Sequence, residues 1–119
     1  MKTHKDLDVW KKAIAYVTEI YTVTKGFPKD EVYGLTNQMR RAAVSIPSNV
    51  AEGAARHSDK EFIHFLYISL GSLQELDTQL TIANNLNFIS LDIFTILQNQ
   101  LNEIGEMLNG LINYKKSKL

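Results

Sequence analysis

Glu61 and His64 form the E-x-x-H motif, a spacing known from metal-binding helices. This spacing places a carboxylate and an imidazole on one helix face, as in the bundle proteins that hold two iron ions. Such a site also needs a second E-x-x-H and two further inward-facing carboxylates, which the sequence does not supply. Ser58 precedes Glu61 by three residues, which is the spacing of a capping box at a helix start. We therefore predict that Glu61 caps a helix, that His64 lies at the edge of a packed face, and that no metal is bound.

Other catalytic chemistry finds little support in the sequence. Cysteine is absent, which excludes disulfides, thiol catalysis and cysteine-ligated metals. His4 and His57 lie near the terminus and at a predicted helix junction, without the context of a Ser/His/Asp triad. Gly53 and Gly71 stand singly inside predicted helices, where close packing is the usual reason for glycine, and form no phosphate-binding loop. We predict a protein that is not an enzyme and binds no cofactor.

The elements that position these residues are helices. Apolar residues recur every three or four positions, which predicts amphipathic helices at about residues 6–25, 30–56, 59–86 and 91–116. The last helix follows heptad spacing at Phe94, Leu97, Leu101, Ile104, Leu108 and Leu111. Short connections between long helices favour antiparallel neighbours. The sequence thus predicts a single all-α domain over residues 1–119, folded as an up-down-up-down four-helix bundle.

The third and fourth helices are richer in apolar residues than one core-facing stripe requires. The additional residues are Ile63, Tyr67, Ile68, Leu70 and Ile82 in the third helix, and Ile93, Ile96, Met107 and Ile112 in the fourth. In a small monomer part of this surface would be exposed to water. Wide apolar faces on short helices are typical of subunit contacts. The pattern favours a homo-oligomer.

Charge is balanced overall but uneven along the chain. The 119 residues include 13 Lys and Arg against 13 Asp and Glu. Residues 1–29 carry six lysines against three acidic residues, whereas residues 58–89 carry one lysine against four acidic residues. We expect these two segments to neutralise each other as neighbours; the alternative is a basic face for nucleic acid or an acidic partner. Without a signal peptide or a span long enough for a bilayer, we expect a cytoplasmic protein with no membrane contact.

The second helix is unusual because Pro47 lies among small residues with arginines at both ends. Proline removes a helix hydrogen bond, so we expect a kink there, and Ser48 or Asn49 could bond the freed groups. The apolar residues of this helix are predicted to face the core of the bundle. A polar stripe runs beside them through Arg41, Ser45, Ser48 or Asn49, Glu52 and Arg56. This stripe is either a solvated face with one Glu52–Arg56 pair or a contact surface for another subunit or a ligand.

The segment LTNQMRRAAVSIPSNVAEG at residues 35–53, with FPKDEVYG before it and FIHFLYISLGSLQELDTQL after it, closely resembles one bacterial family. Its members are four-helix-bundle proteins encoded in intervening sequences of large-subunit ribosomal RNA genes. The same fold family includes the accessory variability determinant of diversity-generating retroelements. The N-terminal DLDVWKKA extends the resemblance, which covers about residues 6–90; the fourth helix matches by pattern.

The resemblance implies a left-handed bundle that assembles as a homopentamer and acts without catalysis. It also implies a rival role, because the accessory determinant binds a reverse transcriptase and nucleic acid through a basic surface. This chain differs in having no net charge. The residues available for nucleic acid or another partner are Lys11, Lys12, Arg40, Arg41 and Arg56, and those assigned to packing or subunit contact are Ser45, Pro47, Asn49, Glu52 and Gly53. The leading hypothesis is a homo-oligomeric scaffold, and the rival is an accessory protein for structured RNA or an RNA–DNA hybrid.

Overall fold

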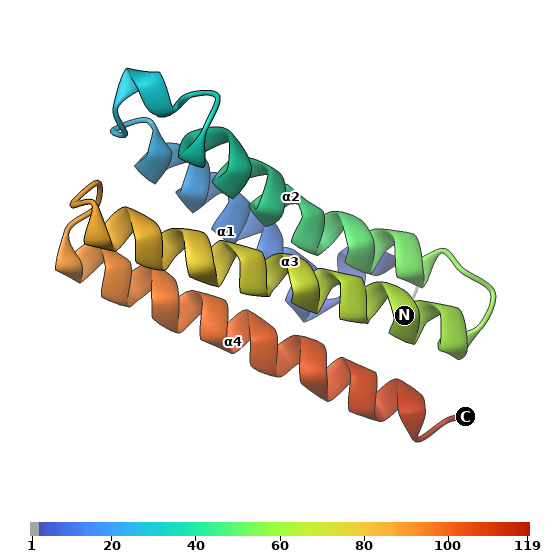
Figure 1. The fold of residues 1–119 in the computed structure, drawn as a ribbon. Helices are drawn as coiled ribbons and strands as arrows, with labels where there is room; N and C mark the ends of the chain where they lie inside the picture. The colour runs from blue at the N-terminus through green and yellow to red at the C-terminus, as the bar shows by residue number, and fades with distance from the viewer. Residues whose placement is uncertain (1–2) are drawn as a thin grey trace.

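The computed structural model describes residues 3–119, which form four α-helices, two 3-10 turns and no strand. The elements are η1 (His4–Asp6), α1 (Asp8–Thr24), η2 (Lys29–Glu31), α2 (Leu35–Ala54), α3 (Asp59–Asn85) and α4 (Leu91–Lys116). Each helix runs opposite to the one before it, and α1 packs on α2, α2 on α3, α3 on α4 and α4 on α1 (Figure 1). The predicted all-α four-helix class is confirmed. No helix of residues 3–119 has the length and hydrophobicity needed to cross a membrane.

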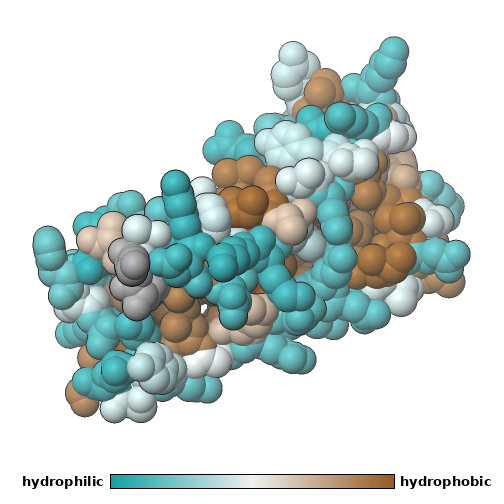
Figure 2. Space-filling view, turned by 180° about the vertical axis from the view of Figure 1, so that it is seen from behind, coloured by the Kyte–Doolittle hydropathy of each residue, from teal (hydrophilic) through white to brown (hydrophobic). Residues whose placement is uncertain are grey.

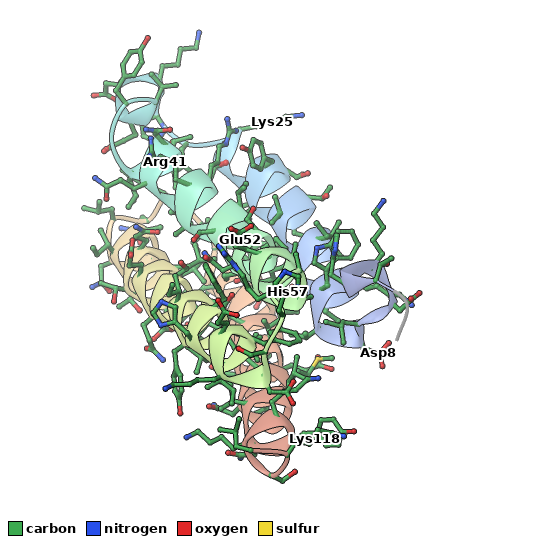
Figure 3. All side chains as sticks on the ribbon, turned by 90° about the vertical axis from the view of Figure 1, so that its right-hand side faces the viewer. Asp8, Lys25, Arg41, Glu52, His57 and Lys118 are labelled. Atoms are coloured by element: carbon green, nitrogen blue, oxygen red, sulfur yellow. The ribbon has the colours of Figure 1, made fainter. Side chains whose placement is uncertain are left out.

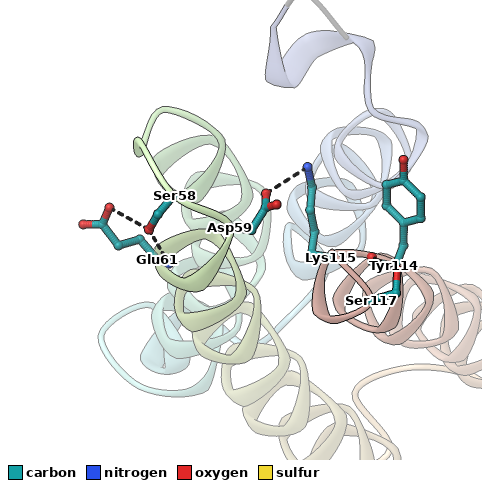
Figure 4. A network of polar contacts seen from close by, with 6 residues as sticks. All are labelled: Ser58, Asp59, Glu61, Tyr114, Lys115 and Ser117. Atoms are coloured by element: carbon teal, nitrogen blue, oxygen red, sulfur yellow. Dashed lines mark hydrogen bonds and ion pairs between the residues drawn. The ribbon is translucent and has the colours of Figure 1, made fainter. Parts of the chain in front are cut away.

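Side-chain caps fix the starts of α3 and α4 where the sequence placed them. The Glu61 backbone N–H donates to Ser58 Oγ at 3.1 Å, and the Ile93 N–H donates to Ser90 Oγ at 3.2 Å. The Ser58 hydroxyl also donates to the Glu61 carboxylate at 3.1 Å (Figure 4). Glu61 thus belongs to the helix cap, as predicted. These caps satisfy backbone N–H groups of the first helical turn, which have no partner within the helix. They act within one turn, so they could be predicted from residue type and spacing alone.

The largest difference from the predicted boundaries is the start of α2. The helix begins at Leu35, about five residues later than the pattern indicated. Pro28 instead opens the short turn η2, and the backbone at Gly34 is not helical, with φ −113° and ψ −117°. From Leu35 onward α2 is unbroken through Pro47, whose side chain is buried. The expected kink at Pro47 therefore stays a prediction, whereas the helix itself does not end there.

The core is a single cluster with contributions from every α-helix. In α4 the central heptad positions Leu97, Leu101, Ile104 and Leu108 are buried, as the spacing predicted. In α1 the buried face is rotated from the predicted apolar stripe, which ran through Leu7, Trp10 and Val17. Val9 and Tyr16 are buried, while Trp10 and Val17 are only half-buried. The apolar period identified these helices correctly. The exact orientation of each buried face about its helix axis depended on the neighbouring helices.

Part of the apolar surplus in α3 and α4 is core. Ile63 and Ile112 are buried, at 8% and 2% exposed. Other members of the surplus remain exposed, namely Tyr67, Ile68, Ile82, Ile93 and Ile96. The outward apolar surface is therefore real but smaller than the sequence pattern indicated. Figure 2 shows hydrophobic residues gathered toward the end of the bundle that holds the α3–α4 turn.

The prediction that the basic segment (residues 1–29) and the acidic segment (residues 58–89) neutralise each other as neighbours is wrong. Helix α1 packs on α2 and α4 but not on α3, so residues 8–24 and 59–85 lie diagonally across the bundle. The ion pairs run between other neighbours. Lys12 of α1 pairs with Glu103 of α4 at 2.7 Å, and Asp59 of α3 pairs with Lys115 of α4 at 3.3 Å (Figure 4). Lys2 of the basic segment lies outside the described residues.

Candidate functional site

The candidate cations are spread over different sides of the bundle. Arg40 and Arg41 are adjacent in sequence, yet Arg40 turns toward α1 and Arg41 lies in a cleft between α2 and α3. Lys12 lies beside α4 through its pair with Glu103. Arg56 lies just beyond the C-terminal end of α2, about four turns of helix from Arg41. These cations therefore form no single basic face.

Two of the arginines are held by the fold. The Arg40 Nε donates to Thr24 Oγ1 at 2.9 Å, and its guanidinium lies 4.6 Å from the centre of the Tyr21 ring. Arg56 pairs with Glu52 at 2.7 Å, which is the i,i+4 pair predicted from the stripe, and lies 4.7 Å from the centre of the Phe65 ring. Because a guanidinium over an aromatic face is already favourably placed, both arginines contribute to packing in the free chain.

The Lys11 and Arg41 side chains are exposed and make no ion pair or hydrogen bond within residues 3–119. They are therefore the two candidates that are free to meet another molecule. Figure 3 labels Arg41 near one end of the bundle and Lys118 at the opposite end, which illustrates how far the charges are dispersed. The sequence left two alternatives for the charges, a single basic face or neutralisation between the two charged segments. Neither holds, since the cations do not converge and the α1 lysines do not pair with the acidic residues of α3.

The polar stripe of α2 divides into an inner and an outer half. Ser45 Oγ lies 2.7 Å from Ser72 Oγ of α3, and the Asn49 amide donates to both the carbonyl and the hydroxyl of Ser45 at 2.9 Å. Nearby, the fully buried Ser69 hydroxyl donates to the Ile46 carbonyl at 2.9 Å. The inner half thus joins α2 to α3. This role differs from both predictions for the stripe, a solvated face and a subunit contact. Asn49 bonds Ser45 and not the Ala43 carbonyl that Pro47 leaves without its helical donor.

Gly53 permits a close contact between α2 and α3. A Cβ built on Gly53 would lie 2.8 Å from Phe62 Cδ1 and 2.8 Å from Phe65 Cβ. Close packing was the predicted reason for this glycine. The same expectation is wrong for Gly71, where a Cβ would meet nothing within 4 Å.

A groove between α1 and α4 was not predicted from the sequence. Its apolar part has a volume of about 270 Å³ and is lined by Thr18, Glu19, Thr22, Val23, Ile93, Ile96 and Leu97. A smaller polar part of about 100 Å³ continues toward Lys12 and Glu103. Between them the Tyr16 hydroxyl donates to the Leu97 carbonyl at 2.9 Å. Burial, with the nearby Glu19 and Asp77 carboxylates, raises the pKa of Tyr16 far above its ordinary value.

The E-x-x-H motif does not form a metal site. Glu61 and His64 are exposed, and the His64 ring stacks edge-on against Phe65 with 5.4 Å between ring centres. Across residues 3–119 no group of three or more His, Asp or Glu side chains could hold a metal ion. The residues present supply a helix cap and a surface ring contact.

Four antiparallel helices around one core define a small four-helix-bundle protein. The family model of the 23S rRNA-intervening sequence proteins matches residues 5–110, and this chain belongs to that family. The fold is similar to the 1.70 Å crystal structure of a protein of unknown function from the S23 ribosomal protein family of Bacteroides thetaiotaomicron VPI-5482. The TM-score is 0.82 at 23% identity, over 88% of this chain and 95% of that chain, a likeness of fold. No curated protein matches.

Proposed function

We propose that this protein is a non-enzymatic homo-oligomeric scaffold whose subunits meet at the α1–α4 groove. The observation that carries the proposal is the apolar surface left open there. Ile96 is 53% exposed and Ile93 is 38% exposed, and both line the α4 wall of the groove. Apolar surface of this kind is removed from water most effectively by a partner of matching shape.

The polar residues of the groove are compatible with a dry contact. The Thr18 hydroxyl donates to the Ile14 carbonyl at 3.3 Å, and the Thr22 hydroxyl donates to the Thr18 carbonyl at 3.1 Å. Both threonines therefore satisfy their donors within α1 and can present methyl groups to a partner. Burying these two threonines leaves no hydroxyl donor without an acceptor. The third polar residue of the lining, Glu19, accepts from the Gln100 amide at 3.4 Å.

A second copy of the chain suits this surface for two reasons. The chain has no net charge, so identical copies do not repel through a net charge. A standard interface covers about 800 Å² on each partner, which is about a ninth of the 6984 Å² surface of one chain. A patch of that size fits within the α1–α4 face. The family resemblance favours five subunits, with a total mass of about 68 kDa from a 13.5 kDa chain.

The test is the mass in solution, measured by light scattering. We expect an oligomer for the wild type and a shift toward 13.5 kDa for Ile96→Glu, because a buried unpaired carboxylate opposes assembly. Ile82→Glu is the matched control, since Ile82 is 42% exposed on α3, away from the groove. Circular dichroism verifies that both variants remain helical. A monomeric wild type would refute the proposal, and equal effects of the two variants would place the interface elsewhere.

The nucleic-acid alternative has less support from the arrangement of the cations, and one measurement separates it from the scaffold. Fluorescence anisotropy with a structured RNA at low and near-physiological salt compares the wild type with a Lys11→Glu, Arg41→Glu variant. These two residues are exposed and unpaired, so the variant should keep its fold. Binding that falls steeply with salt and is lost in the variant would favour RNA, because phosphate contacts release counterions. We expect no such binding by the intact oligomer.

A further inference from the structure

A second cleft lies between α2 and α3, a pair of helices that forms the opposite side of the bundle from the α1–α4 groove. It has a volume of about 330 Å³ and polar walls. Gln38, Arg41 and Ser45 line it from α2, and Ser72, Glu75 and Gln79 line it from α3. The cleft shares no lining residue with the groove of the proposed subunit contact.

The antiparallel register sets the groups of the two walls opposite one another. Ser45 and Ser72 bond at one end of the cleft, with 2.7 Å between their oxygens. Gln38 and Gln79 each lie seven residues, or about two helical turns, from that bond and therefore face one another at the other end. Arg41 and Glu75 lie between these levels on opposite walls. Within residues 3–119 no ion pair or hydrogen bond engages either side chain.

Gln79 distinguishes this cleft from an ordinary surface cleft. Its side chain is only 8% exposed, and its buried Oε1 receives no hydrogen bond from residues 3–119. Buried carbonyl oxygens in folded proteins almost always have a donor. The neighbouring buried polar groups obey this rule, since the Ser45, Ser72 and Ser69 side chains are all bonded. Gln79 thus lines the cleft together with Glu75 and holds a buried acceptor that lacks a donor.

We propose that this cleft binds the zwitterionic backbone of a free α-amino acid. The ligand's ammonium group is the donor that the Gln79 oxygen and the Glu75 carboxylate require. Its carboxylate is the acceptor that the Arg41 guanidinium requires, and guanidinium–carboxylate hydrogen bonds are among the stronger ones in proteins. The cleft lies at the small end of the range for ligand sites, which suits a small polar molecule. One cation and one anion on the walls match a ligand with no net charge.

Equilibrium dialysis tests the proposal with the full-length protein and six labelled probes: glycine, L-alanine, L-serine, L-glutamine, L-leucine and L-lysine. We expect saturable binding of at least one, with a dissociation constant below about 1 mM. Unlabelled N-acetylglycine lacks the ammonium, glycinamide lacks the carboxylate, and neither should compete. If both compete as well as glycine, the zwitterion is not recognised and the proposal fails.

Three variants assign the binding to this cleft. Arg41→Gln and Glu75→Gln change exposed side chains, and Gln79→Met removes the buried oxygen while keeping a similar volume. Each should weaken binding at least tenfold. Arg56→Gln is the matched control outside the cleft and should bind as the wild type does. Light scattering and circular dichroism confirm that every variant keeps the wild-type mass and helicity. No saturable binding of any probe by the wild type would mean that Gln79 bonds only water and would overturn the proposal, as would binding that survives all three variants.

Discussion

Replacing Gly53 by alanine tests the close contact between α2 and α3. The new Cβ would lie 2.8 Å from Phe65 Cβ and 3.2 Å from the Phe62 carbonyl oxygen. Real Cβ atoms essentially never approach other heavy atoms closer than 3.0 Å. A ring tip could rotate away, but a Cβ and a carbonyl oxygen move only with the backbone. The substitution therefore forces α2 and α3 apart at this level.

Two opposing effects set the magnitude. Alanine is favoured over glycine inside a helix by about 1 kcal/mol. Overpacking typically costs about 1–3 kcal/mol, and we take the upper end because backbone atoms must shift. The free energy of unfolding should therefore fall by about 2 kcal/mol. For a domain of this size, about 4 °C per kcal/mol places the loss in melting temperature near 8 °C.

Urea denaturation at one fixed protein concentration measures this change, because the stability of an oligomer depends on concentration. Gly71→Ala is the matched control. Gly71 is exposed within α3 and a Cβ there meets nothing within 4 Å, so the variant should gain up to about 1 kcal/mol. If Gly53→Ala proves as stable as Gly71→Ala, the two helices are not in close contact at Gly53 and the argument is refuted.

Three further predictions concern single polar groups. Ser69→Ala should lower the free energy of unfolding by about 1 kcal/mol in urea denaturation, because the Ile46 carbonyl loses its buried donor; an unchanged value would contradict this role. Ser58→Ala should lose about 1 kcal/mol through the missing N-cap, measured in the same way, and a loss near zero would argue against the cap. Tyr16 ionises in the unfolded chain above its ordinary pKa of 10.0 but stays neutral in the fold, so stability should fall as pH rises past 10. Tyr16→Phe should remove up to about 1.4 kcal/mol per pH unit of that slope; a slope equal to that of the wild type would refute the assignment.

Much of the fold could be read from local pattern. The apolar period located all four helices, and Ser58 and Ser90 marked the starts of α3 and α4 because an N-cap acts within one turn of its own residue. The start of α2 was missed because Gly34 and the turn after Pro28 interrupt a pattern whose apolar spacing continues through them. Periodicity reports which residues face a core, and it is less sensitive to where the backbone leaves the helix.

The candidate sites depended on which helices are neighbours. Arg40 and Arg41 are equivalent in sequence, yet one binds Thr24 of α1 and the other lies free in the α2–α3 cleft. Gly53 and Gly71 likewise differ only because another helix approaches the first. Tyr16 and Gln79 were not distinguished in advance, since their burial comes from residues far along the chain.

By itself the sequence determined the helices, most of their buried faces, two of their caps and the family to which the chain belongs. The helices, their buried faces and their caps are set by interactions within a few residues, and the family is recognised from short sequence motifs. Only the tertiary structure decided how the charges are paired, where the α1–α4 groove opens and that the buried side-chain oxygens of Gln79 and Gln100 lack a donor. The physical reason is that hydrogen bonds, ion pairs and burial between helices depend on register and rotation, which no single helix specifies.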